Sequence, residues 1–360
     1  MTSVAKRKIT RPVCLGNVQI GGGAPVAVQS MTCTDTRDVK ATVAQIRRLE
    51  KAGCEIARVA VPDMDAAMAL GAIKKKINLP LIADIHFDYR LALEAIRRGA
   101  DGIRINPGNM KPGKIREVIK AAKASGTVIR IGINSGSLEK ELHAKYGGAT
   151  ADALVASALR NIALFEDMGF EALKISIKSS DVLTTISACR IVSQKTDYPL
   201  HLGVTEAGSI IHAAIKSSLG IGILLSEGIG DTIRVSVTGD PVSEVGVAYG
   251  ILRALEIRKV GPDIISCPTC GRCEIDLVRL TREVEKKLAG MKTYMKIALM
   301  GCVVNGPGEA VEADIGIAGG RGFGIIFKKG KMARKVREKD LVPALLEEVK
   351  HLAAEKQKSR

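Results

Sequence analysis

The sequence predicts an α/β protein, an eight-stranded βα barrel of the TIM type followed by a smaller α+β domain. Between residues 26 and 258, apolar strand-like runs alternate eight times with amphipathic stretches of helical period. This pattern stops at residues 260–262, and clustered cysteines and a hairpin signal follow. A length of 360 residues suits a barrel of about 250 residues with a second domain of about 100.

Each expected barrel strand is short and is followed by a helical pattern such as 39–52 or 154–168. The expected strands are 26–31, 56–61, 81–85, 102–106, 127–134, 172–178, 200–205 and 232–238. Successive βα units give parallel strands, and eight units favour a closed barrel over an open sheet. We therefore expect the barrel to occupy residues 1–259.

Residues 260–360 are expected to form the α+β domain. The pattern predicts a helix at 274–288, strands at 295–300, 313–317 and 324–327, and a last helix at 341–354. Gly-Gly-Arg-Gly between the last two strands is a hairpin signal. The basic run at 328–339 is expected to be a solvated helix face or a surface turn.

Composition excludes several classes of protein. No run approaches the ~18 apolar residues of a membrane span, and the basic start lacks a signal-peptide core, so we expect a cytoplasmic protein without membrane association. A net charge of +16 indicates an anionic ligand or an acidic partner. Nucleic acid is disfavoured, because aromatic residues make up only 3% of the chain and no binding motif occurs.

Cations interrupt the apolar barrel strands near their carboxyl ends, where barrel active sites lie. They are Arg58, Arg104, Arg130, Lys178 and Arg234. Burying such a charge costs several kcal/mol unless an anion meets it, and the arginine fork matches phosphate oxygens. Pairing with nearby acids is the alternative, but strand-end acids are too few to neutralise every cation. We therefore expect a phosphate-bearing ligand at the barrel mouth.

Other polar side chains also stand at the strand ends. They are Asp84, His86, Asn134, Glu206 and Ser236. Glu206 follows an apolar run and precedes two small residues, which makes it the best candidate for a general acid or base.

Four cysteines lie within 36 residues of one another, Cys267, Cys270 and Cys273 as C-x-x-C-x-x-C and Cys302 further along the chain. In a cytoplasmic protein this clustering indicates a metal site rather than disulfides. The spacing leaves three possibilities open. All four thiolates could bind an iron–sulfur cluster, an oxygen ligand could replace Cys273, or the site could hold a structural zinc ion.

Motifs from both predicted domains resemble the GcpE family of 4-hydroxy-3-methylbut-2-enyl diphosphate synthases. The resembling pieces are VAVQSMT, IARVAVP, ADIHF, GIRINPGN, RIGIN, KISIKSSD, GVTEAG, RVSVTGDP, SCPTCGR and GCVVNGPGE. They occur in order over nearly the whole chain. The resemblance implies reductive opening and dehydroxylation of 2-C-methyl-D-erythritol 2,4-cyclodiphosphate in the methylerythritol phosphate pathway of isoprenoid biosynthesis.

The same resemblance implies a [4Fe–4S] cluster held by Cys267, Cys270, Cys302 and Glu309, with Cys273 left out. The diphosphate would be bound by residues of the barrel motifs and of the cysteine loop, namely Arg58, Arg104, Arg130, Lys178 and Ser236, with Asn134 and Asn305 nearby. Glu206 matches the family's catalytic carboxylate, and Asp84, His86 and Arg234 are further site residues.

The resemblance also implies a head-to-tail homodimer, in which the cluster domain of one subunit caps the barrel of the other. A ferredoxin or flavodoxin would supply the electrons. The competing interpretation is a barrel aldolase or transferase with a structural zinc site.

Overall fold

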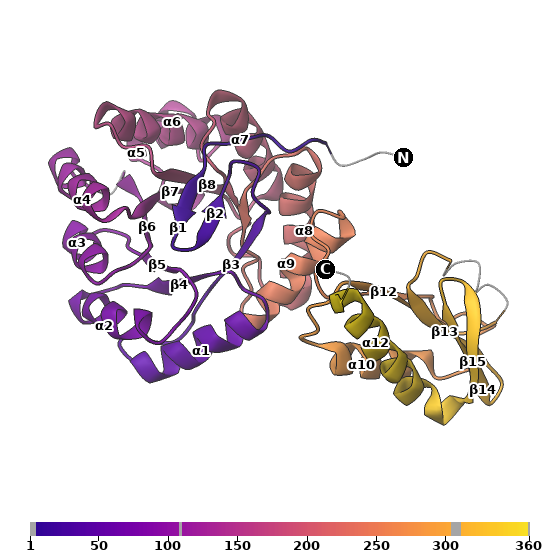
Figure 1. Ribbon diagram of the computed structural model, residues 1–360. Coiled ribbons are helices and arrows are strands. Elements are labelled where there is room, and N and C mark those ends of the chain that lie inside the picture. Colours follow the sequence, from indigo (N-terminus) through magenta and orange to yellow (C-terminus); the bar gives the residue numbers. More distant parts are fainter. Residues whose placement is uncertain (1–4, 108–109, 304–310, 359–360) are drawn as a thin grey trace. The chain divides into compact units, whose positions relative to one another are not determined.

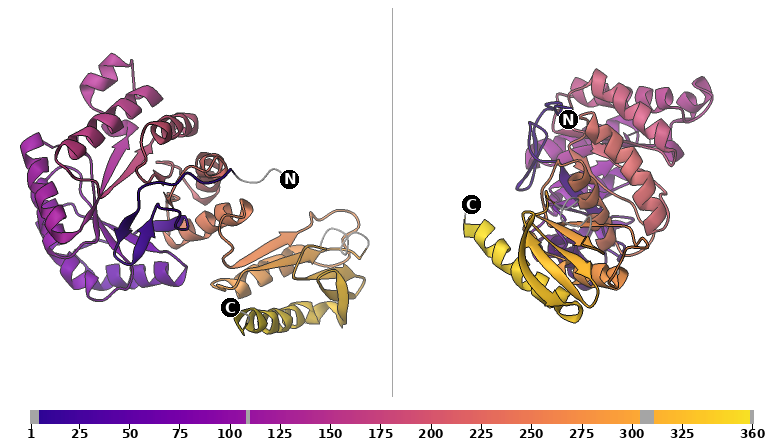
Figure 2. Two further views of the ribbon diagram at one scale, coloured as in Figure 1. Left: turned by 45° about the horizontal axis from the view of Figure 1, so that its top comes forward. Right: turned by 90° about the vertical axis from the view of Figure 1, so that its right-hand side faces the viewer.

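The computed structural model describes residues 5–107, 110–303 and 311–358. Two compact units make up the chain, Met1–Arg258 and Lys259–Arg360, and each is described by itself (Figures 1 and 2). In the described ranges, no helix is both long and apolar enough to cross a lipid bilayer.

Eight parallel strands form the sheet of the first unit, which confirms the predicted barrel (Figure 1). They are β3 (Ala27–Met31), β4 (Ile56–Ala60), β5 (Leu81–Asp84), β6 (Gly102–Ile105), β7 (Val128–Asn134), β8 (Leu173–Lys178), β9 (His201–Leu202) and β10 (Thr232–Ile233). The strand order is β8-β7-β6-β5-β4-β3-β10-β9. A parallel bridge between Ile175 and Leu200 joins the two ends of this order, so the sheet closes on itself.

Strands β9 and β10 are shorter than the sequence predicts, with two residues each in place of the expected 200–205 and 232–238. Val204 and Val235 beyond them are fully buried, so the apolar pattern continues where regular strand pairing has stopped. An apolar pattern in the sequence indicates that a segment is buried. It does not show whether the backbone of that segment has hydrogen-bond partners in a neighbouring strand, which a β-strand also requires.

Helices follow the strands and surround the barrel (Figure 1). They are α1 (Val39–Lys51), α2 (Met64–Lys74), α3 (Tyr89–Arg97), α4 (Pro112–Ser125), α5 (Lys140–Lys145), α6 (Ala151–Asp167), α7 (Val182–Lys195), α8 (Ile210–Ser226) and α9 (Val242–Ala254). Four of them begin at an aspartate whose carboxylate accepts a backbone N–H of the first turn, at Asp38, Asp63, Asp88 and Asp181. These caps define where each strand-to-helix loop ends.

A hairpin that the sequence analysis did not anticipate precedes the barrel. It consists of β1 (Val13–Leu15) and β2 (Val18–Ile20), paired antiparallel. Its apolar side chains pack against Ala27, Ile56 and Val128, the first residues of β3, β4 and β7. The hairpin therefore covers the amino ends of the strands, and the opposite end remains for a binding site.

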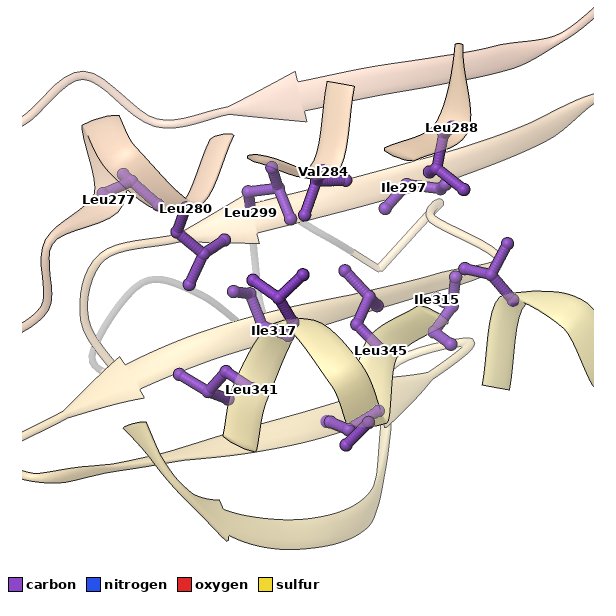
Figure 3. Close-up of a cluster of buried hydrophobic side chains, with 14 of the residues drawn as sticks. Leu277, Leu280, Val284, Leu288, Ile297, Leu299, Ile315, Ile317, Leu341 and Leu345 are labelled. Atoms are coloured by element: carbon purple, nitrogen blue, oxygen red, sulfur yellow. The ribbon is translucent and has the colours of Figure 1, made fainter. Parts of the chain in front are cut away.

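The second unit is a five-stranded sheet covered by helices. Its strands are β11 (Pro262–Ser266), β12 (Met295–Met300), β13 (Ile315–Gly320), β14 (Phe323–Lys328) and β15 (Lys331–Arg337), in that order across the sheet. The pairs among β11, β12 and β13 are parallel, and those from β13 to β15 are antiparallel. Helices α10 (Leu277–Leu288) and α12 (Leu341–Lys358) bury their apolar side chains against β12 and β13 (Figure 3).

The interpretation of residues 328–339 as a helix face or surface turn is wrong, because most of this run forms the edge strand β15. Nearly all its side chains are exposed and many are charged, so no alternation of apolar and polar residues marks it as a strand. Pairing with β14 determines its conformation, and its lysines and arginines suit an exposed sheet edge.

Candidate active site

One pocket of about 140 Å³ opens near the carboxyl ends of the barrel strands. Its lining includes nine of the predicted site residues, Arg58, Asp84, His86, Arg104, Arg130, Asn134, Lys178, Arg234 and Ser236. Ser176 and Thr205 complete the lining and were not predicted. They are small hydroxyl residues in apolar surroundings, and nothing in their local sequence distinguishes them from structural serines and threonines.

Strand register explains why these side chains converge. Asp84, Arg104 and Arg130 are Cα partners across β5, β6 and β7, so they stand at one level of the barrel. Asn134 and Lys178, the last residues of β7 and β8, are Cα partners four residues beyond Arg130 on β7, nearer the open end. Side chains two or four residues apart on a strand point to the same face, and here that face is the barrel interior.

Asp84 is the carboxylate at the centre of the charged group. Its oxygens lie 4.0 Å from Arg58 Nε and 3.5 Å from Arg104 Nη1. Burial opposes ionisation of this side chain, but the charge of Arg58, the His86 hydrogen bond and the charge of Arg104 outweigh it and hold the pKa of Asp84 well below its usual range. Asp84 is therefore a fixed anion that orients the arginines and not a proton donor.

Arg58 and Arg234 differ in how far the protein compensates their charges, since Arg58 lies 4.0 Å from the nearest carboxylate oxygen that pairs with it. Arg234 forms a two-pronged ion pair with the buried Glu244, at 2.9 and 3.1 Å. Both guanidinium groups also point at the Met31 sulfur, at 2.9 Å from Arg58 and 3.7 Å from Arg234. A thioether is a weak acceptor, so it neutralises neither cation. Burial lowers the pKa of Arg58 to about 10, although the negative charge of Asp84 acts in the opposite direction and raises it.

Arg130 and Lys178 are deeply buried cations of the pocket, 2% and 6% exposed. Burial first, and then the neighbouring arginines, lower the pKa of both well below their usual values. Among the described residues, Arg130 Nε has no hydrogen-bond partner. Arg130 Nη1 reaches only the Gln29 amide oxygen, at 3.5 Å. Neighbouring like charges at this depth are costly, and a multiply charged anion would relieve that cost.

Two glycines make room for these cations. A side chain on Gly132 of β7 would collide with the Arg104 guanidinium, and one on Gly203 would collide with the Lys178 ammonium. The sequence contains the signal for both, a glycine facing inward from a strand, which often marks a close approach by another group. The sequence analysis quoted the motifs RIGIN and GVTEAG without assigning these glycines a role.

Glu206, the expected general acid or base, is exposed in the loop after β9 and is not among the residues that line the pocket. Its φ of +53° is a left-handed conformation that a residue with a side chain rarely adopts. Such strain occurs often at functional sites, because the surrounding structure must maintain it. Thr205, its neighbour, does line the pocket.

In the second unit, the predicted cluster ligand Cys267 contacts the residue that precedes Cys302. Cys267 follows β11, and its sulfur accepts the Gly301 backbone N–H at 3.2 Å. Cys302 is the next residue along the chain. Cys270 is exposed, and hydrogen bonds from Arg272 lower the pKa of its thiol. Backbone N–H groups that point at sulfur are typical of iron–sulfur sites, so this donor set fits such a cluster.

Cys273 differs from the proposed ligands in the hydrogen bond that it forms. Its thiol donates to the Ile275 carbonyl at 3.2 Å, and its side chain, like that of Cys267, packs against the apolar core of the second unit. Glu309 and Asn305 lie outside the described residues. Within the residues that the structure does describe, no three acidic, histidine or cysteine side chains gather closely enough to hold a metal ion.

Comparison with known proteins places both units in one family. The model of the GcpE TIM-barrel domain matches residues 10–249, and that of the GcpE protein C-terminal domain matches residues 263–351. The chain belongs to the GcpE family. The match to the second GcpE model includes all four cysteines of the cluster region.

Relatives of this GcpE chain are closely similar over nearly their whole length. A protein of Lawsonia intracellularis is 61% identical over 97% of this chain and 98% of its own. One of Geobacter sulfurreducens is 56% identical over 96% and 99%. Both are named 4-hydroxy-3-methylbut-2-en-1-yl diphosphate synthase (flavodoxin). The interpretation as an aldolase or transferase with structural zinc finds no support among them.

Proposed function

We propose that this chain converts 2-C-methyl-D-erythritol 2,4-cyclodiphosphate into 4-hydroxy-3-methylbut-2-enyl diphosphate by a two-electron reduction. Family membership supports the reaction, since the relatives are named for synthesis of this product. The observation that carries the proposal on structural grounds is the barrel pocket, where five cations face the carboxylates of Asp84 and Glu244. A diphosphate supplies the negative charge that this pocket lacks.

The pocket residues have separate roles in this proposal. Arg58, Arg104, Arg130 and Lys178 bind the diphosphate oxygens, and Ser236 and Asn134 orient them by hydrogen bonds. With its amide nitrogen turned toward the Ile133 carbonyl, Asn134 accepts from Arg104 Nη2 at 3.0 Å. Asp84 and Glu244 hold the arginine forks in place before the substrate arrives, so little reorganisation is needed on binding.

We assign proton donation to Glu206. Loss of a hydroxyl group as water requires a proton, and Glu206 stands in the loop beside the pocket residue Thr205. Its positive φ is consistent with a functional role, because such conformations are frequent at active sites. His86, 3.4 Å from Asp84 and about half exposed, is placed to contact the substrate at the rim.

We further propose that residues 260–360 hold a [4Fe–4S] cluster through Cys267, Cys270, Cys302 and Glu309. When bound, the cluster would pass the two electrons of the reaction, one at a time, from the external donor to the substrate. The Gly301 N–H that points at Cys267 would stabilise its thiolate, and Arg272 favours the thiolate of Cys270. Asn305, four residues before Glu309 in the sequence, is assigned to the substrate. Residues 1–259 would bind the substrate.

A cytoplasmic flavodoxin or ferredoxin is the proposed electron donor. The names of the relatives specify flavodoxin for those proteins. Such carriers are acidic, and the net charge of +16 on this chain would accelerate their docking at low ionic strength. We also propose a head-to-tail homodimer, because substrate site and cluster belong to different units of the chain and must meet for electron transfer.

Turnover of the cyclic diphosphate by anaerobically purified protein tests this function directly. With reduced flavodoxin or a chemical reductant, the protein should release the allylic diphosphate and contain iron and sulfide. Glu206→Gln should keep the iron and lose most of the turnover. Protein that contains zinc without iron, or that carries the cluster without reducing this substrate, would contradict the proposal.

A further inference from the structure

We propose that His201 is a positioning residue that holds the Lys178 ammonium in the barrel pocket, and that Thr232 fixes the imidazole tautomer this requires. Lys178 lines the pocket, whereas His201 and Thr232 are not among its lining residues and act through Lys178. What Lys178 binds rests on the proposed function, but the contact between these three side chains does not.

The three side chains form a short chain of hydrogen bonds inside the barrel. His201 Nε2 lies 3.3 Å from Lys178 Nζ, and His201 Nδ1 lies 2.8 Å from Thr232 Oγ1. His201 is 1% exposed and Thr232 is fully buried. The Lys178 ammonium also lies against Gly203, where a side chain would displace it. Neighbouring strands β8, β9 and β10 therefore contribute one member each to the chain.

The chemistry of the groups determines the direction of each hydrogen bond. As an ammonium, the form that would bind phosphate, Lys178 can only donate, so in this state His201 Nε2 accepts from it. A ring nitrogen that accepts carries no proton, so the single proton of the neutral ring stands on Nδ1 and is donated to Thr232 Oγ1. The Lys178 ammonium already disfavours the other tautomer, which would set two donors against each other, and Thr232 adds to this preference by accepting the Nδ1 proton.

The electrostatic surroundings keep the ring neutral. Burial, and then the charges of Lys178, Arg130, Lys174 and Arg58, lower the pKa of His201 well below its usual value. The carboxylate of Asp231 lies on the same side of the barrel, where it accepts from Thr10 and from the Leu200 N–H. An imidazolium ring would stand 3.3 Å from a second cation, so the neutral form is the one that packs here.

A neutral acceptor suits this position because Lys178 must stay available for phosphate. A carboxylate in place of His201 would neutralise the ammonium and compete with the ligand, whereas a neutral nitrogen orients it and leaves its charge intact. Lysine has a flexible four-carbon stem, so anchoring its head before binding reduces the entropy lost when the diphosphate arrives.

Nitrogen-15 NMR of the full-length anaerobic protein tests the tautomer without any ligand. In protein labelled at histidine, the His201 ring should carry its proton on Nδ1 and none on Nε2 at neutral pH, with the signal assigned by its loss in His201→Gln. A ring protonated on Nε2, or on both nitrogens, would overturn the inference whatever the enzyme binds.

Matched variants test the role in binding, with inorganic pyrophosphate as the probe. Thr232→Ser keeps the hydroxyl and should bind like the unsubstituted protein, whereas the near-isosteric Thr232→Val should bind roughly tenfold more weakly. His201→Gln, which can still present an acceptor, should bind better than His201→Leu. Equal affinities within both pairs would overturn the positioning role. If the unsubstituted protein does not bind pyrophosphate, the proposed function fails, and the tautomer measurement decides the inference alone.

Discussion

At the scale of single residues, the pocket depends on charges that the protein leaves partly uncompensated. Arg104 is 4% exposed, and its contacts with Asp84, His86 and the Gly132 carbonyl are long, at 3.4 to 3.5 Å. Hydrogen bonds of this length are weak, so they orient the guanidinium group but leave much of its hydrogen-bonding capacity free for a ligand. Each pocket cation should therefore contribute more to ligand binding than to the stability of the fold.

Arg104→Ala should weaken binding of the diphosphate substrate by roughly 2–5 kcal/mol, because it removes a cation from a site with little water. Titration calorimetry with the substrate or with pyrophosphate would measure the loss. Arg97→Ala is the matched control, since Arg97 is exposed on α3 and pairs only with Glu94 on its own helix. An affinity unchanged by Arg104→Ala would mean that this arginine has a structural role only.

The cysteines also differ as single residues. Cys273→Ser should retain the cluster, because Cys273 is not one of the proposed ligands and its thiol is already engaged with the Ile275 carbonyl. Cys302→Ser should lose most of its iron, since a serine hydroxyl is a poor iron ligand. Iron analysis and the visible absorption of anaerobic samples would measure both. The reverse pattern would overturn the ligand assignment.

At the scale of elements, α10 connects the cysteine turn to the core of the second unit. Its buried residues recur at helical spacing, at Leu277, Leu280, Val284 and Leu288 (Figure 3). Asp276 caps its first turn by accepting the Arg279 N–H at 3.1 Å. The turn that carries Cys270 and Cys273 thus leads into a helix whose position is fixed by packing.

Val284→Ala should destabilise the second unit by about 2 kcal/mol, because it removes two fully buried methyl groups and leaves a cavity. Val278→Ala on the same helix is the matched control, since Val278 is 48% exposed, and its effect should stay within about 0.5 kcal/mol. Urea unfolding of the full-length protein, followed by circular dichroism, would compare them. Equal effects would contradict the packing described for α10.

At the scale of the whole molecule, the proposed function requires residues from both units. The anion pocket belongs to Met1–Arg258 and the cysteines to Lys259–Arg360. In a head-to-tail dimer, each complete site would combine the barrel of one subunit with the cluster of the other. A site shared between two subunits can be distinguished by experiment from a site formed within a single chain.

Mixed dimers of Glu206→Gln and Cys302→Ser subunits should regain activity although each variant alone is inactive. A heterodimer would pair the intact barrel of one subunit with the intact cluster of the other, so a statistical mixture should reach about a quarter of the normal rate. Turnover assays on co-refolded subunits would measure it. Glu206→Gln mixed with Arg104→Ala is the control and should stay inactive. Failure of the first mixture to recover would exclude the shared site.

Much of the fold was predictable from this sequence, because buried residues of helices and strands recur at regular spacings in the chain. The eight βα units and strand β12 follow from apolar runs and helical spacing. The hairpin of β1 and β2, the strand β11 and the edge strand β15 were not predicted. These strands are short or polar, so they carry no clear apolar pattern. Each is a strand because it pairs with another strand, and the residue pattern does not specify that pairing.

The sequence by itself determined the family, the barrel and the presence of strand-end cations, since these depend on residue types and their spacing. Only the tertiary structure decided that nine of the predicted residues share one pocket, that Glu206 stands outside its lining, and that His201 contacts Lys178. Strand register and barrel closure decide which inward-facing side chains meet. Which side chains meet therefore depends on backbone pairing between segments that are distant in the sequence, and the sequence of a single segment does not determine it.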